Sequence, residues 1–214
     1  MRKLFRGLFW VALALGVIVG GLRGLVLRWW QVPMGDPSLE ASIAPSLRGG
    51  DWVILWRASS PAFGDLVVCP EPGSPGRVAI GRIVGEQADT VEIEGNQAWI
   101  NNGRVATEFA CAERKFIVHD PVSGTEVEGF CQMEVVGGVE HMRGSATTQS
   151  NTPIRTKHTV GPGMVFLLSD DRIYPWDSRR YGEVEQKTCT EAVVFRLWSK
   201  DGFLDVKNRF ESIR

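Results

Sequence analysis

This sequence has no excess of positive or negative charge, and it lacks the usual motifs for binding metals and nucleotides. Its 214 residues contain 24 lysines and arginines against 25 aspartates and glutamates, so no overall field draws it to nucleic acid. The three histidines, His119, His141 and His158, are scattered, and no cysteine spacing fits a zinc site. Internal repeats, heptads and a Gly-rich phosphate loop in its strand–turn–helix context are also missing. The sequence therefore predicts no metal, no cofactor, no nucleotide and no nucleic acid.

The N-terminus has the one strong local charge asymmetry. Arg2, Lys3 and Arg6 precede an apolar run from Gly7 that continues, with one interruption at Arg23, to Leu27. A basic flank before about 20 apolar residues is typical of a transmembrane helix with its N-terminus in the cytoplasm. We predict a cytoplasmic segment at 1–6, a single transmembrane anchor at 7–27 and an extracytoplasmic domain at 28–214. The alternative is a cleaved signal peptide, although no small-x-small cleavage site with a convincing polar region follows the run.

The rest of the chain consists of short β-branched and aromatic runs separated by turn signals. We expect strands at Trp52–Trp56, Leu66–Cys69, Val78–Val84, Thr90–Ile93, Ala98–Ile100, Val165–Leu168 and Ala192–Trp198. Two stretches, about 107–132 and 137–157, lack this pattern of short apolar runs and are interpreted as insertions. The pattern predicts a single, mostly β domain.

The cysteine count is even, and the predicted anchor places the domain in an oxidising compartment, where disulfides are allowed. Cys111 and Cys131 lie close together in sequence, within the first insertion. A bridge between them would stabilise the fold by about 3 kcal/mol. The alternative is free thiols, and the partners of Cys69 and Cys189 stay open.

Four segments in order resemble the conserved boxes of type I signal peptidases (leader peptidases, peptidase family S26). Ser42 to Asp51 resembles the box SMxPTLxxGD, Gly64 to Val68 resembles GDVVV, and Ile80 to Ile93 resembles IKRVxGxxGDxVxI. Ser169 to Gly182 resembles GDNRxxSxDSRxxG. The resemblance covers nearly the whole chain apart from the two insertions. It implies a signal-peptidase-type β fold, with a catalytic-type β core and an inserted β/loop subdomain, at the outer face of a bacterial inner membrane.

The resemblance also implies a reaction centre, in which a serine attacks the peptide and a lysine of lowered pKa acts as general base. Ser42 stands at the nucleophile position. Gly81 replaces the lysine, Pro175 replaces the serine that orients the lysine, and Glu40 replaces the serine that helps to hold the oxyanion. Arg82 follows Gly81 but stays protonated, so it is no substitute base.

The charged residues of the boxes match the family pattern. They are Asp51, Asp170, Arg172, Asp177 and Arg179. We expect them to form buried or half-buried ion pairs that hold loops beside strands. The sequence thus predicts an intact scaffold around an altered reaction centre.

Three functions are compatible with this pattern. The preferred one is a protein impaired or inactive as a serine endopeptidase, which binds signal peptides of exported chains or a protein partner at the membrane lipid surface. The alternative is an active signal-peptide endopeptidase with another base: Glu40, if it shares a strand face with Ser42, or Lys115, His119 or His158. The third is a structural membrane protein whose groove is closed, which Glu40 would fit if it pairs with Arg82 or another cation.

Tryptophan gathers near the point where the chain would leave the bilayer, at Trp29, Trp30, Trp52 and Trp56. Tryptophan favours the membrane interface, so these rings are expected either to seat the domain on lipid or to pack in its core.

Overall fold

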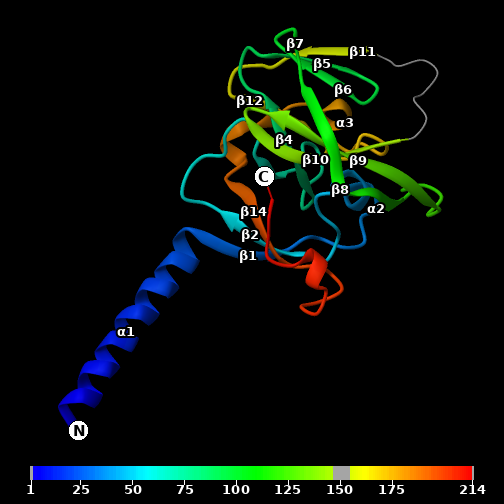
Figure 1. Cartoon of the computed structure of the whole chain (residues 1–214). Coiled ribbons are helices and arrows are strands. Elements are labelled where there is room, and N and C mark those ends of the chain that lie inside the picture. Colours follow the sequence, from blue (N-terminus) through cyan, green and yellow to red (C-terminus); the bar gives the residue numbers. More distant parts are fainter. Residues whose placement is uncertain (1, 147–154, 214) are drawn as a thin grey trace.

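The computed structural model describes residues 2–146 and 155–213, and it shows an N-terminal helix attached to a mostly β body (Figure 1). The helix, α1 (Arg2–Leu25), projects away from the body, and strand β1 (Leu27–Gln31) follows it almost at once. The predicted anchor therefore ends too late, because Leu27 already pairs with Trp56 in a sheet. Within the part of the chain that the structure describes, no helix is long and apolar enough to cross a membrane.

The largest sheet has eight strands and carries most of the body. Its order is β1-β2-β14-β3-β4-β12-β13, with β15 beside β14, and the pairs are antiparallel. The further strands are β2 (Trp52–Trp56), β3 (Leu66–Pro70), β4 (Val78–Gly85), β12 (Met164–Leu168), β13 (Val184–Glu185), β14 (Glu191–Trp198) and β15 (Glu211–Ser212). Four short helices lie between strands: α2 (Pro37–Ser42), α3 (Ser178–Tyr181), η1 (Gln186–Thr188) and η2 (Val206–Asn208).

Two smaller sheets complete the body. One has the order β11-β5-β6-β7, formed by β5 (Thr90–Glu94), β6 (Gln97–Ile100), β7 (Gly103–Arg104) and β11 (Arg155–Thr159). The other has the order β10-β9-β8, formed by β8 (Ala106–His119), β9 (Glu126–Val136) and β10 (Val139–Ser145). The stretches interpreted as insertions are therefore largely ordered strands, and residues 147–154 of the second lie outside the described residues.

The strands of the large sheet form because their side chains divide between core and surface with period two. In β2, Val53 and Leu55 are fully buried while the residues beside them are not. In β4, every residue after Val78 is buried, as in a strand that is covered on both faces. Arg82 therefore places a guanidinium inside the core, and its partners decide the geometry of the site described below.

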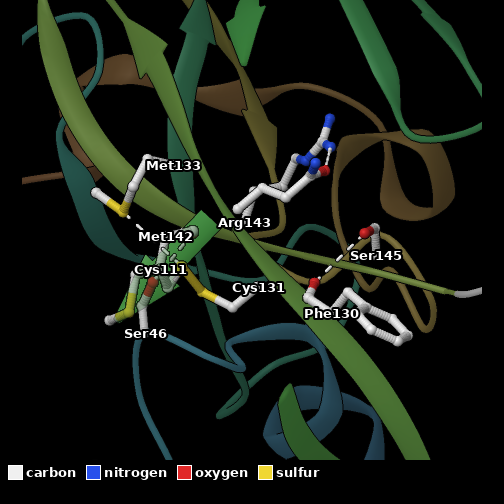
Figure 2. Close-up of a disulfide and its surroundings, with 9 residues drawn as sticks. Ser46, Cys111, Phe130, Cys131, Met133, Met142, Arg143 and Ser145 are labelled. Atoms are coloured by element: carbon white, nitrogen blue, oxygen red, sulfur yellow. Dashed lines mark hydrogen bonds between the residues drawn. A yellow bond between two sulfur atoms is a disulfide. The ribbon is translucent and has the colours of Figure 1, made fainter. Parts of the chain in front are cut away.

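Two disulfides link segments that the sheets bring together. Cys111 on β8 is bonded to Cys131 on β9 (Figure 2), which confirms the predicted bridge and rules out free thiols there. Cys69 at the end of β3 is bonded to Cys189 before β14, a pairing that their separation of 120 residues kept out of reach of sequence reasoning.

The four tryptophans divide between surface and core. Trp29 and Trp56 are exposed, at 45% and 36% of their surface, whereas Trp30 packs against the main core. The ring of Trp52 lies 5.9 Å from that of Trp198. Packing therefore accounts for Trp30 and Trp52, whereas Trp29 and Trp56 lie at the surface.

Candidate functional site

Ser42 is the last residue of the short helix α2. The helix begins because Asp36 caps it, accepting a hydrogen bond from the Leu39 N–H at 3.2 Å, and because Pro37 fits the first turn. Ser42 is completely buried, and its hydroxyl donates to the carbonyl of Leu39 at 2.8 Å. Within the described part of the chain, this is the hydroxyl's one hydrogen bond. The candidate nucleophile is therefore engaged by its own helix.

Glu40 does not face Ser42. The alternative base Glu40 required both side chains on one face of a strand, but residues two apart in a helix are rotated by roughly 200°, so they point in different directions. The Glu40 carboxylate accepts from the Gly35 N–H at 2.6 Å and packs against Gly49, where a Cβ would lie 2.6 Å from Glu40 Cδ. The catalytic interpretation of Glu40 is thus wrong for this geometry. Its proposed pairing with Arg82 is also wrong, because Arg82 binds Asp170.

Gly81 lies in the middle of β4, where space for a side chain is short. A Cβ at this position would lie 3.2 Å from Leu167 Cβ and 3.2 Å from the Leu168 carbonyl oxygen, both on the neighbouring strand β12. Such contacts are tighter than usual, so the strand would have to shift slightly to accept any side chain. The position that the resemblance assigns to the general base is filled by its neighbours.

Arg82, the next residue, is part of a buried ion pair. Its Nε donates to Asp170 Oδ1 at 2.7 Å, its Nη2 donates to Asp170 Oδ2 at 3.2 Å, and its Nη1 donates to the Gly64 carbonyl. A bidentate arginine–carboxylate pair of this kind is strong and directional. It fixes the loop after β12 against β4.

None of the other candidate bases contacts the Ser42 hydroxyl, whose hydrogen bond among the described residues goes to the Leu39 carbonyl. Lys115 is exposed and pairs with Glu128 at 2.8 Å, and exposed His158 contacts Glu183 at 2.5 Å. His119 is exposed near the end of β8. Pro175 is half-buried in the loop between β12 and α3. The structure therefore does not bring a general base to Ser42 from the residues that we considered.

A second buried ion cluster connects this loop to the three-stranded sheet. Arg172 donates to Glu134 on β9 at 2.5 Å, and His141 on β10 lies 3.3 Å from the same carboxylate. Burial alone would raise the pKa of Glu134, but Arg172, His141 and Arg143 lower it to about 2. Burial, followed by the charge of Arg82, lowers the pKa of His141. Sequence reasoning missed this cluster, because Glu134 and His141 are isolated polar residues until β9 and β10 pair.

The remaining box residues are also paired. Arg196 on β14 donates to Asp51 at 3.2 Å, and Asp51 also accepts from the backbone N–H groups of Arg48 and Lys200. Asp177 is bonded to Arg179 at 2.6 Å and caps α3. Burial would raise the pKa of Asp177, but Arg179 holds it below the usual value. The Asp51–Arg196 pair joins the loop before β2 to β14, whereas the Asp177–Arg179 pair is local to the start of α3.

Asp171, which the sequence analysis did not single out, has a buried carboxyl group and contacts the backbone of Ser42. Its backbone N–H donates to the Ser42 carbonyl at 3.0 Å, and its Oδ1 accepts from the Ile173 N–H. Oδ2 is buried and has no hydrogen-bond partner among the described residues. Burial raises the pKa of Asp171 to about 7. The similar signal-peptidase box has asparagine at this position, so the difference was visible in the sequence. Only the structure shows that Asp171 is buried, and burial is what disfavours its charged form.

Two cavities flank this region, and neither is lined by Ser42, Gly81 or Pro175. One, of about 550 Å³, is lined by residues that include Ser46, Arg82 and His141. Figure 2 shows Ser46 beside Met142 and the Cys111–Cys131 disulfide, consistent with the 3.4 Å hydrogen bond from Ser46 to the Met142 carbonyl. The other, of about 910 Å³, lies between α2 and the end of the β8–β9 hairpin.

A buried serine segment, an Asp-Arg box and a mostly β body together have the architecture of a signal-peptidase-type protein. Comparison with known sequences agrees. The family model of signal peptidase, peptidase S26, matches residues 6–198. This chain belongs to that family.

Individual relatives have low sequence identity, but two of those named here align over about four fifths of this chain. Signal peptidase I of Streptococcus pneumoniae serotype 4 is 26% identical over 177 residues, which cover 81% of this chain and 84% of the relative. Signal peptidase I of Pseudomonas aeruginosa is 24% identical over 182 residues, covering 78% of this chain and 59% of the relative. That of Bacillus caldolyticus is 24% identical over 117 residues.

Substitution of Asp171 by asparagine is expected to stabilise the protein at neutral and alkaline pH. The unfolded carboxyl titrates near 3.8, whereas the folded one titrates near 7. Because the folded state holds the proton more tightly, the wild-type protein loses stability as the pH rises from about 4 to about 7, and loses no more above that. Asp171→Asn should therefore raise the free energy of unfolding by about 2 to 4 kcal/mol near pH 8, with a smaller difference near pH 4.

Urea unfolding at several pH values measures this difference. Asp201→Asn, at an exposed turn, is the matched control and should show no such trend. An Asp171→Asn variant whose advantage does not change with pH would contradict the assignment.

Proposed function

We propose that this protein is a non-catalytic member of the signal peptidase family, which binds segments of exported proteins at the outer face of a bacterial inner membrane without cutting them. The observation that carries the proposal is the state of Ser42. Its hydroxyl is buried and donates to Leu39, while Gly81 offers no base. Amide hydrolysis by serine needs a base within about 3 Å of the hydroxyl and donors for the oxyanion.

The magnitude of the loss supports the proposal. Removing one member of a nucleophile–base unit can lower the rate by about 10⁶, so the remaining catalysis would rest on binding alone. Here the base, its orienting group and the oxyanion donor are replaced by Gly81, Pro175 and Glu40. Meanwhile the ion pairs of the scaffold are kept, Arg82 with Asp170 among them. Retention of the fold without the reaction centre favours a binding function.

We further propose that α1 holds the protein at the membrane. Many of its apolar side chains are exposed, among them Leu8, Trp10 and Ile18 at 61%, 61% and 57%. Leaving such a surface in water is unfavourable at about 25 cal/mol per Å². The two disulfides fit an oxidising compartment outside the cytoplasm. In Figure 1, α1 and the C-terminal loop around η2 both extend from the lower side of the body, and that loop exposes Leu204 and Val206.

Ser42→Ala is the decisive test of the first proposal. Incubation of the detergent-solubilised protein with a secretory preprotein should give no cleavage above background, and Ser42→Ala should behave like the wild type. Gel analysis of the processed and unprocessed preprotein measures the outcome. Ser38→Ala, in the same helix, controls for effects on α2. Turnover that Ser42→Ala abolishes and Ser38→Ala preserves would overturn the proposal.

Gly81→Lys is expected to give no recovery of peptidase activity. The new side chain would meet Leu167 and the Leu168 carbonyl at about the distances given above, and Ser42 would still be bonded to Leu39. Strain of this kind typically costs about 1 to 3 kcal/mol of stability, which thermal unfolding would detect. Efficient preprotein cleavage by this single variant would show that the base was the one missing part.

Removal of residues 2–25 is expected to release the protein from membranes. The full chain should sediment with the membrane fraction after expression in bacteria, and the truncated chain should stay in the supernatant. Immunoblotting of the fractions measures the distribution. Equal distribution of the two chains would contradict an anchoring role for α1.

A further inference from the structure

Strand β8 presents an open edge. In the three-stranded sheet β10-β9-β8 it pairs with β9 on one side, and no strand pairs with its other side in the described part of the chain. An edge strand offers a row of backbone N–H and C=O groups that another extended chain can pair with. Most of its outer residues are exposed.

The register identifies which groups point outward. The Asp120 N–H donates to the Thr125 carbonyl at 2.9 Å, and from there the pairs run Val118 with Val127 and Phe116 with Gly129. In an antiparallel ladder, residues that bond to the partner strand alternate with residues whose N–H and C=O face away. Lys115, Ile117 and His119 therefore direct their backbone groups to the open edge.

A groove runs along this edge. The cavity of about 910 Å³ is lined on one side by the α2 residues Pro37, Glu40 and Ala41, and on the other by the consecutive residues 115–124. Consecutive residues, rather than alternate ones, line a groove that follows a strand's backbone edge instead of one of its faces. On the inner face, Val118 packs with Ala41, which holds β8 against α2.

The chemistry of the groove suits an extended peptide. Backbone groups spaced along Lys115–His119 offer roughly 16 Å of pairing surface. Exposed Ile117, at 55%, gives an incoming chain an apolar neighbour. The charged side chains at the groove are of both signs, including Arg48, Lys200 and Glu126, so neither a phosphate nor an acidic polymer is favoured.

We propose that a segment of an exported protein binds in this groove as an added strand on the edge of β8. Strand addition draws its affinity from main-chain hydrogen bonds and its selectivity from the pockets for alternate side chains. The proposal rests on the proposed binding function and moves the binding site away from Ser42, whose segment is helical and buried.

Ile117→Pro tests the backbone contact. Proline removes an N–H that faces the open edge and spares the bonds between β8 and β9, and edge strands tolerate it. The probe is a fluorescein-labelled synthetic signal peptide, titrated with the full chain in detergent and followed by fluorescence anisotropy. We expect Ile117→Pro to weaken binding about tenfold or more, because it removes one hydrogen bond and displaces the paired chain. Ile117→Ala keeps the N–H and should change the Kd by about threefold or less.

The outcomes separate this inference from the proposed function. Wild-type affinity in Ile117→Pro overturns the groove assignment but leaves peptide binding intact, whereas no binding by the wild-type protein contradicts the proposed function itself. Equal weakening by Ile117→Ala and Ile117→Pro overturns strand addition. If Ile117→Pro lowers thermal stability markedly, a probe with ester groups in place of its central amides, measured on the wild-type protein, gives the same test: unchanged affinity overturns the inference. Dimerisation that Ile117→Pro abolishes and that the peptide does not displace would assign the edge to a second copy of the chain and overturn the inference.

Discussion

The buried ion pair between Arg82 and Asp170 is the contact on which the rest of the site depends. It joins the central strand β4 to the loop after β12, and the neighbouring pair between Arg172 and Glu134 joins the same loop to the sheet β10-β9-β8. Loss of one partner in such a pair leaves a charge uncompensated in the core, which typically costs about 3 to 5 kcal/mol. The two pairs therefore hold the large sheet, the loop after β12 and the three-stranded sheet together.

Under the proposed function, this constraint explains how the scaffold is kept while the reaction centre changes. The guanidinium of Arg82 is committed to Asp170, so the chain keeps it whether or not peptide bonds are cut. Ser42, in contrast, is held by its own helix, and Gly81 gives its space to Leu167. A fold can retain its ion pairs for stability after the groups that perform chemistry have been replaced. The binding surface has then to be sought elsewhere, and the open edge of β8 offers one.

The strands of the large sheet were within reach of the sequence, because runs such as Trp52–Trp56 and Val78–Gly85 combine apolar, β-branched and aromatic residues between turn signals. The short helix at Pro37–Ser42 was not predicted, although Asp36 and Pro37 are standard start signals, because a helix of six residues is too short to show a periodic apolar pattern. The strands β8, β9 and β10 were hidden as well. Their polar, exposed residues give no strong alternation, and pairing over long distance supplies the order.

The sequence by itself determined the family, the mostly β class and the Cys111–Cys131 bridge, since each is a property of residue types at fixed spacing. Only the tertiary structure decided where the Ser42 hydroxyl points, which carboxylate Arg82 binds and why Asp171 holds a proton near neutral pH. Those properties depend on burial and on partners far away in the chain, and neither is encoded in any local pattern. The same reason makes the β8 edge visible only after its neighbours have been placed.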